Sequence, residues 1–196
     1  MTTAALWQLA LDTIRDPREA GRRILAMEVP SDALWMALAL AVVLNAGLFG
    51  LSNELAPPPP DVPVGTVSPV AFALFLFTGV LATVFAVYRV GRALGGEASF
   101  HGTMALLVWL QFLRVLVQAA LLVLVPLLPV LAAIVVIAAA VIGFWILLNF
   151  IDVAHGYDNI FKSLGVLVLS VLAMAFGLSL LLALFGGSFL GVSGNV

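Results

Sequence analysis

The fold is decided by residues 103–151, TMALLVWLQFLRVLVQAALLVLVPLLPVLAAIVVIAAAVIGFWILLNFI. Apart from Arg114, no side chain in this stretch is charged. A transmembrane helix needs about 20 apolar residues to cross roughly 30 Å of hydrocarbon, so the stretch is long enough for two crossings. Pro126 and Pro129 lie near its middle, where proline ends helices. The stretch therefore predicts a tight hairpin of two membrane-spanning helices.

Three more apolar stretches predict further spans. The chain is 64% hydrophobic and 9% charged, whereas soluble domains have roughly 25% charged residues. Most of its surface must therefore meet lipid. Ser31 or Asp32 can cap the first span, and Pro69 suits the first turn of the second. We predict an all-α membrane protein with five transmembrane helices, at residues 33–51, 69–90, 103–125, from 127 or 129 to 151, and 160–185.

The cations predict the orientation, because Lys and Arg are retained on the cytoplasmic side of a membrane. Seven of the eight Lys and Arg residues fall on one side of the predicted spans, and the loops and tail on the other side hold none. The amino terminus is therefore expected in the cytoplasm and the carboxyl terminus outside. These seven residues are Arg15, Arg18, Arg22, Arg23, Arg89, Arg92 and Lys162.

The amino segment, residues 1–30, is predicted to form one or two short amphipathic helices. Apolar residues recur there at helical spacing, at Leu6, Leu9, Ala10 and Ile14. The run from Asp16 to Glu19 resembles a capping box that opens a second helix. Two interpretations are open: the arginines dock the segment on lipid or on a partner, or the segment packs against the bundle. The predicted domains are a cytoplasmic segment at 1–30, a five-helix transmembrane domain at 31–186 and a short outer tail at 187–196.

The two inner loops share a pattern: a glycine, an acid two residues later and a phenylalanine five residues later. A duplicated hairpin would produce this pattern, as in many transport folds. Good loop chemistry would also produce it, with a left-handed glycine, an acid near the next helix start and an anchoring phenylalanine. The residues are Gly95, Glu97 and Phe100 in one loop and Gly156, Asp158 and Phe161 in the other.

Several short motifs together resemble the Yip domain family, the Ypt/Rab-interacting integral membrane proteins, in its bacterial branch. They are Asp16-Pro17, the turn LGGEASF at 94–100, WLQ at 109–111, Trp145 and AHGY at 154–157, set among five spans. The resemblance implies a five-span inner-membrane protein. Its eukaryotic relatives bind prenylated small GTPases in vesicle traffic and carry a long polar amino region. This chain shows no such region, so we do not expect the GTPase role here.

Arg114 lies in the middle of the third span, where an unpaired cation is costly. Together with Gln111 and Gln118 it forms one helical stripe, which we expect to face the bundle. One interpretation is a structural ion pair with Asp152, or bonds to carbonyl and glutamine oxygens. The other is a substrate or anion site or a proton-coupled path. The predicted buried polar cluster contains Asn45, which could bond to Gln118, and Gln111, Arg114, Gln118, Asn149 and Asp152.

No catalytic set appears in the sequence. The absence of Cys excludes thiol chemistry, and the net charge of −2 argues against nucleic acid as a partner. His101, Asp152, His155 and Asp158 are metal-binding residue types, but their spacing favours solvated caps. We expect no enzyme activity, no cofactor and no metal.

The predicted function is that of a multi-pass protein of a bacterial inner (plasma) membrane, acting as a membrane-organising or complex-associated subunit. Its expected partners are the lipid bilayer and other membrane proteins, or further copies of itself as a homo-oligomer. The alternative is a small transporter or channel with a polar path around Arg114.

The topology is testable with reporter fusions. Fusions after Gly95 and Gly156 are expected to report the cytoplasm, and fusions after Pro60 and Val196 the outside, because the cations flank only one side of the spans. An outside signal after Gly156 would contradict the five-span arrangement.

Overall fold

The computed structural model describes residues 3–55 and 67–189, and every regular element in these ranges is an α-helix. Five of the helices are long and apolar enough to cross a membrane, which confirms the predicted fold class. The helices are α1 (Thr3–Arg15), α2 (Pro17–Ala26), α3 (Ser31–Leu55), α4 (Pro69–Ala93), α5 (Phe100–Leu127), α6 (Pro129–His155) and α7 (Ile160–Phe189).

The spanning helices extend beyond the limits predicted from hydropathy. For example, α5 begins at Phe100 rather than at residue 103, because the Ser99 hydroxyl accepts a hydrogen bond from the Gly102 amide and caps the helix there. Hydropathy detects only the apolar part of a helix, whereas the backbone continues to the nearest cap. The predicted hairpin turn is tighter than expected, since Leu128 is both the C-cap of α5 and the N-cap of α6. Most of the predicted outer tail lies outside the described residues.

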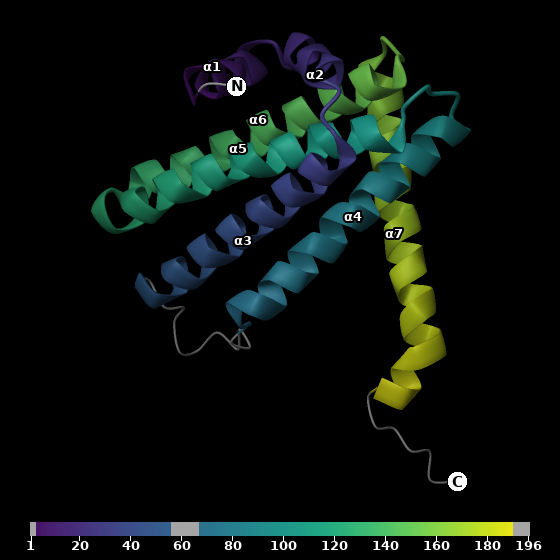
Figure 1. The fold of residues 1–196 in the computed structure, drawn as a ribbon. Helices are drawn as coiled ribbons and strands as arrows, with labels where there is room; N and C mark the ends of the chain where they lie inside the picture. Colours follow the sequence, from purple (N-terminus) through teal and green to yellow (C-terminus); the bar gives the residue numbers. More distant parts are fainter. Residues whose placement is uncertain (1–2, 56–66, 190–196) are drawn as a thin grey trace, which may run out of the picture.

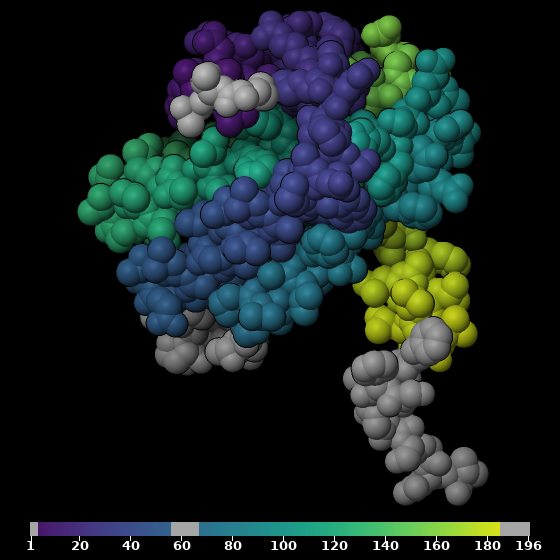
Figure 2. Space-filling model, in the orientation of Figure 1, coloured from purple at the N-terminus to yellow at the C-terminus, as the bar shows by residue number. Residues whose placement is uncertain are grey.

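The spanning helices converge at one end of the molecule and spread apart at the other (Figure 1). The α5–α6 hairpin, the pair α3 and α4, and α7 leave the convergent end in different directions. The short helices α1 and α2 cover this end, as the space-filling view in Figure 2 also shows. We call the convergent end, with α1, α2 and the loops at residues 94–99 and 156–159, the junction.

The hydrophobic core lies near the junction and draws on all four helices from α3 to α6. Leu38, Val84, Leu106 and Phe150 are almost fully buried there, one from each of these helices. Towards the opposite end, large apolar side chains are exposed on α6 and α7, where lipid would cover them.

At the junction, α4 and α6 approach so closely that only glycine fits. A Cβ atom on Gly91 would lie 1.9 Å from Nε2 of His155, and one on Gly96 would lie 2.5 Å from its Cδ2. The His155 ring is buried and stacks on Tyr157, with ring centroids 5.3 Å apart, and the Tyr157 hydroxyl donates a hydrogen bond to the Gly91 carbonyl. The end of α4 and the loop after α6 are therefore held together through His155.

We expect Gly91→Ala to destabilise the protein by about 1–3 kcal/mol or more, because the new methyl group must displace a buried imidazole. Gly143→Ala on α6 is the matched control. A Cβ there meets nothing within 4 Å, so replacing a helical glycine should leave stability unchanged or raise it by up to about 1 kcal/mol. Thermal unfolding followed by tryptophan fluorescence in detergent compares the two. Equal unfolding temperatures would contradict the close contact.

Candidate functional site

The most deeply buried charge of the described residues is the Asp152 carboxylate at the junction end of α6. Its side chain is 2% exposed, and its Oδ2 forms an ion pair with Nη2 of Arg18 at 2.7 Å. Nε of the same arginine donates a hydrogen bond to Oδ1 of Asn149, one turn earlier on α6, at 3.2 Å. One arginine of α2 thus bonds to two successive turns of α6.

The second oxygen of Asp152 connects α6 to α7. Oδ1 accepts a hydrogen bond from the Asn159 amide at 2.8 Å and one from the Ser163 hydroxyl at 3.3 Å. Both carboxylate oxygens are therefore bonded, as a buried charge requires. The group joins three elements: α2, α6 and the start of α7.

Local sequence features place Arg18 at this position. Asp16 is the N-cap of α2, and its Oδ1 accepts a hydrogen bond from the Glu19 amide at 3.0 Å, which confirms the predicted cap. Pro17 suits the first turn of the helix. Gly21 lets α2 approach α6, because a Cβ there would lie 3.3 Å from the Phe150 ring. Arg18 therefore projects from the first turn of a capped helix pressed against α6.

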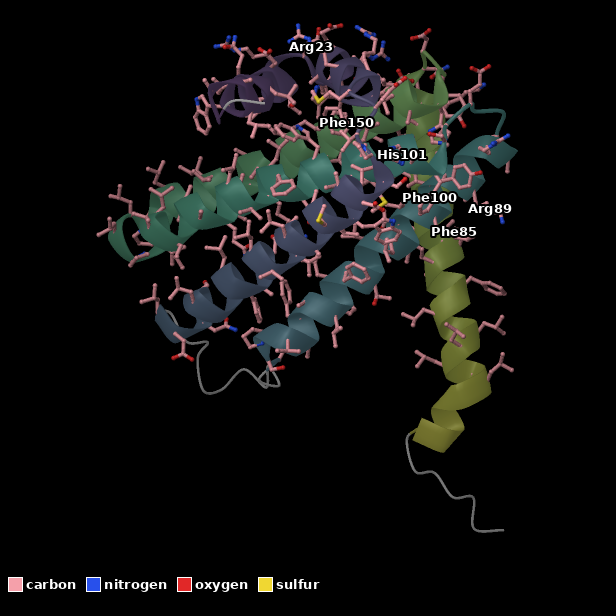
Figure 3. The ribbon with its side chains drawn as sticks, viewed as in Figure 1. Arg23, Phe85, Arg89, Phe100, His101 and Phe150 are labelled. Atoms are coloured by element: carbon pink, nitrogen blue, oxygen red, sulfur yellow. The ribbon has the colours of Figure 1, made fainter. Side chains whose placement is uncertain are left out.

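Three of the four amino-terminal arginines form ion pairs within the chain. Besides Arg18, Arg22 pairs with Glu19 at 3.1 Å, and Arg23 pairs with Glu19 at 3.2 Å and with Asp12 at 2.9 Å. Hydrogen bonds from Arg22 and Arg23 lower the pKa of the Glu19 carboxyl. Figure 3 shows Arg23 on the outer surface of the junction. These pairs favour packing of the segment on the bundle over docking through free arginines.

The predicted pairing of Arg114 with Asp152 is wrong: Asp152 pairs with Arg18 instead. The physical reason is depth. Arg114 is fourteen residues from the junction end of α5, about 21 Å, whereas Asp152 is three residues from the end of α6, about 5 Å. Arg114 is exposed and forms no ion pair with the described residues. The expectation that it faces the bundle interior is also wrong.

The rest of the predicted polar cluster divides into two groups. Asn149 lies with Asp152 at the junction, and its Nδ2 donates a hydrogen bond to the Trp145 carbonyl at 2.8 Å. Gln111 and Gln118 lie along α5, and the buried Oε1 atom of each has no hydrogen-bond partner among the described residues. The predicted bond from Asn45 to Gln118 is not formed, since the Asn45 amide donates to the Ala41 carbonyl in its own helix.

The two inner loops lie against each other at the junction. Gly95 and Gly156 both adopt positive φ, 83° and 66°, and the Glu97 amide donates a hydrogen bond to the His155 carbonyl at 3.1 Å. The two phenylalanines of the shared pattern differ in their environments. Phe100 packs edge-on against Tyr88 with ring centroids 6.0 Å apart, whereas Phe161 is 80% exposed and does not anchor its helix. Asp158 is exposed in the second loop.

An open cavity of about 390 Å³ lies beside these loops and is lined by Glu28, Glu97, Ser99, His101 and Thr103, among others. His101 is held by hydrogen bonds: its Nε2 donates to the Val29 carbonyl at 2.7 Å, and its Nδ1 accepts from the Ser31 hydroxyl at 3.4 Å. Over the part of the chain that the structure describes, no three potential ligands group into a metal site. In the loop after α6, burial raises the pKa of the Tyr157 hydroxyl, and the Lys162 ammonium lies 5.1 Å from the centre of the Tyr157 ring.

Sequence reasoning missed Arg18 as a site residue. The distance of each charged residue from the end of its helix could have indicated the pairing. Asp152 is close to the end of α6, so it lies at the membrane surface beside the amino segment and not at the depth of Arg114. Arg18 also stands two residues after a capping aspartate, a position that fixes its place in the first turn.

Among protein families, the family model described as the Yip1 domain matches residues 11–183 of the chain. The matched range runs from α1 to α7 and includes Arg18, Arg114 and Asp152. No curated protein and no solved structure matches the chain.

Two double-mutant cycles test the assignment of Asp152. Arg18→Leu or Asp152→Leu alone is expected to cost about 2–4 kcal/mol, because each leaves an unpaired charge, and the double variant should cost clearly less than the sum. The matched cycle of Arg114→Leu with Asp152→Leu should be additive. Thermal unfolding of the purified protein provides the measurement. Additive losses in the first cycle would rule out the ion pair.

Proposed function

Since the chain belongs to the Yip1 domain family, we propose that this polytopic membrane protein is a non-enzymatic subunit of a larger membrane complex. In this proposal the junction is the rigid part of the molecule, and α5 contacts another protein within the bilayer. The observation that carries the proposal is the exposure of Arg114, which lies halfway along α5.

A cation exposed within the spanning part of α5 requires acceptors. The cost of an unpaired arginine at this depth is at least a few kcal/mol by any estimate, so the charge must be met by a partner or reach the lipid headgroups. No carboxylate of the described chain pairs with Arg114, since Asp152 is already bonded through both of its oxygens. A second membrane protein with an acidic side chain at this depth would complement the charge better than a second copy of this chain.

The alternative function, a transporter with a path around Arg114, has less support. A transport path needs a polar cavity that reaches the charge. The 390 Å³ cavity lies at the junction, and neither Arg114 nor the neighbouring glutamines Gln111 and Gln118 line it. A second cavity between α4, α5 and α6 is about 10 Å³, with an apolar lining.

The proposal is tested by comparing the parent with Arg114→Lys and Arg114→Leu in native membranes. Chemical crosslinking and native electrophoresis are expected to show a complex larger than the monomer for the parent. Arg114→Lys should retain part of it, and Arg114→Leu should lose it at least tenfold, because only the lysine keeps the charge. The unfolding temperature of the purified Arg114→Leu chain should stay near that of the parent, since Arg114 is exposed and forms no ion pair with the described residues.

Two outcomes would contradict this function. One is a complex that is unchanged in Arg114→Leu. The other is solute flux in proteoliposomes of the parent that Arg114→Leu abolishes, which would favour the transporter instead.

A further inference from the structure

Helix α1 carries a row of large apolar side chains that the described chain leaves partly uncovered. Trp7 is 60% exposed, Leu11 40% and Ile14 50%, and their spacing places them on one line along the helix. The buried side chains Leu9 and Thr13 form a separate line that faces the bundle. We call the first line the apolar stripe of α1, residues Trp7, Leu11 and Ile14.

A polar stripe runs beside the apolar one. Each of its residues follows a residue of the apolar stripe by one position, which is about 100° further round the helix. The polar stripe consists of Gln8, Asp12 and Arg15. Helix α1 thus has three sides: the buried line of Leu9 and Thr13 faces the bundle, the apolar stripe forms one flank and the polar stripe forms the other. A helix that lies in the surface of a membrane, packed sideways against a protein, requires this division.

A hydrogen bond fixes the depth of α1. The Trp109 indole donates to the Thr13 hydroxyl at 3.0 Å. Because about 20 residues cover the hydrocarbon, counting back from the end of α5 at Leu127 places the boundary near residue 108, beside Trp109. The same count along α6 from Pro129 ends near Asn149, the residue that bonds to Arg18 of α2. Both counts place α1 and α2 at the junction-side boundary of the hydrocarbon.

The tryptophans support this depth. The chain has four, Trp7, Trp35, Trp109 and Trp145. Trp35 lies in the second turn of α3, and counting about 20 residues back from Leu55 ends at this residue. Trp35 and Trp145 are 42% and 50% exposed. Tryptophan concentrates at membrane–water interfaces, so these side chains mark one boundary, and Trp7 belongs to the same belt.

Charge does not explain an attraction of this segment to the membrane. Four acidic side chains balance the four arginines of residues 1–30, and three of those arginines are already paired within the chain. The apolar stripe, in contrast, is exposed on a helix that the bond from Trp109 to Thr13 holds at the boundary depth.

We propose that α1 is an interfacial helix whose apolar stripe inserts into the leaflet at the junction, driven by the burial of Trp7, Leu11 and Ile14 and not by anionic headgroups. The occupant of this face is therefore the lipid boundary itself. Because α1 is followed directly by α2, insertion also holds Arg18 against Asp152.

The test uses spin labels on the full-length protein, whose sequence has no native cysteine. Leu11→Cys carries the label on the apolar stripe, and Gln8→Cys carries it on the polar stripe as the matched control. Each labelled protein is placed in nanodiscs of phosphatidylcholine, with and without phosphatidylglycerol. Power saturation then compares the accessibility of the label to oxygen, which concentrates in lipid, with its accessibility to a water-soluble nickel complex.

The label at residue 11 is expected to be several-fold more accessible to oxygen than to nickel, and the label at residue 8 to show the reverse. Neither ratio should change with phosphatidylglycerol or with raised salt. A residue 11 label open to nickel would overturn the insertion, and a label shielded from both reagents would show that protein covers the stripe. Insertion that requires phosphatidylglycerol would overturn the apolar driving force.

Discussion

The junction depends on the ion pair between Arg18 and Asp152. A carboxylate that is 2% exposed would be strongly destabilising if it lacked partners, and here α2 and the start of α7 supply them. The requirement to satisfy one buried charge therefore fixes the position of α2 on α6 and of α7 beside them. Helix α1 follows, because a single residue, Asp16, separates it from α2.

A second constraint, which is steric rather than electrostatic, acts at the same end of the molecule. His155 lies against Gly91 and Gly96, and its neighbour Tyr157 bonds to the Gly91 carbonyl, so the two inner loops cannot separate without exposing a buried imidazole. At the opposite end α3 and α4 still touch, since a Cβ on Gly50 would lie 2.9 Å from the Pro69 ring and Phe49 stacks on Phe72. This pair of helices, the α5–α6 hairpin and α7 nevertheless diverge from one another there. This difference agrees with a protein that is rigid at one membrane surface and open to lipid or to partners within the bilayer.

The two groups of charges at different depths have different roles. At the junction, the arginines of α2 are balanced by acidic side chains close at hand, so this region is held together by its own ion pairs. Within the spanning part of α5, Arg114 has no ion-pair partner among the described residues and lies on the surface of the helix. A cation in hydrocarbon without an ion pair in the described chain is the observation on which the proposed contact with a partner rests.

The sequence by itself determined the structural features that depend only on residues close together in the chain. Apolar runs of membrane length predicted the five spans, Asp16 followed by Pro17 predicted the start of α2, and Gly95 and Gly156 indicated left-handed turns. Each of these features follows from local backbone geometry or from the thickness of a bilayer. Helix ends were less predictable, because caps such as Ser99 extend a helix beyond its apolar part.

Only the tertiary structure decided which charges meet. Asp152 pairs with Arg18, far away in the sequence, and not with Arg114, because a pair needs equal depth as well as opposite charge. The exposure of Arg114 and the burial of the unpartnered glutamine oxygens depend on how α5 is rotated against its neighbours. The polar stripe of a single helix shows which residues share a face, but the packing of the other helices decides whether that face lies inside the bundle or outside it.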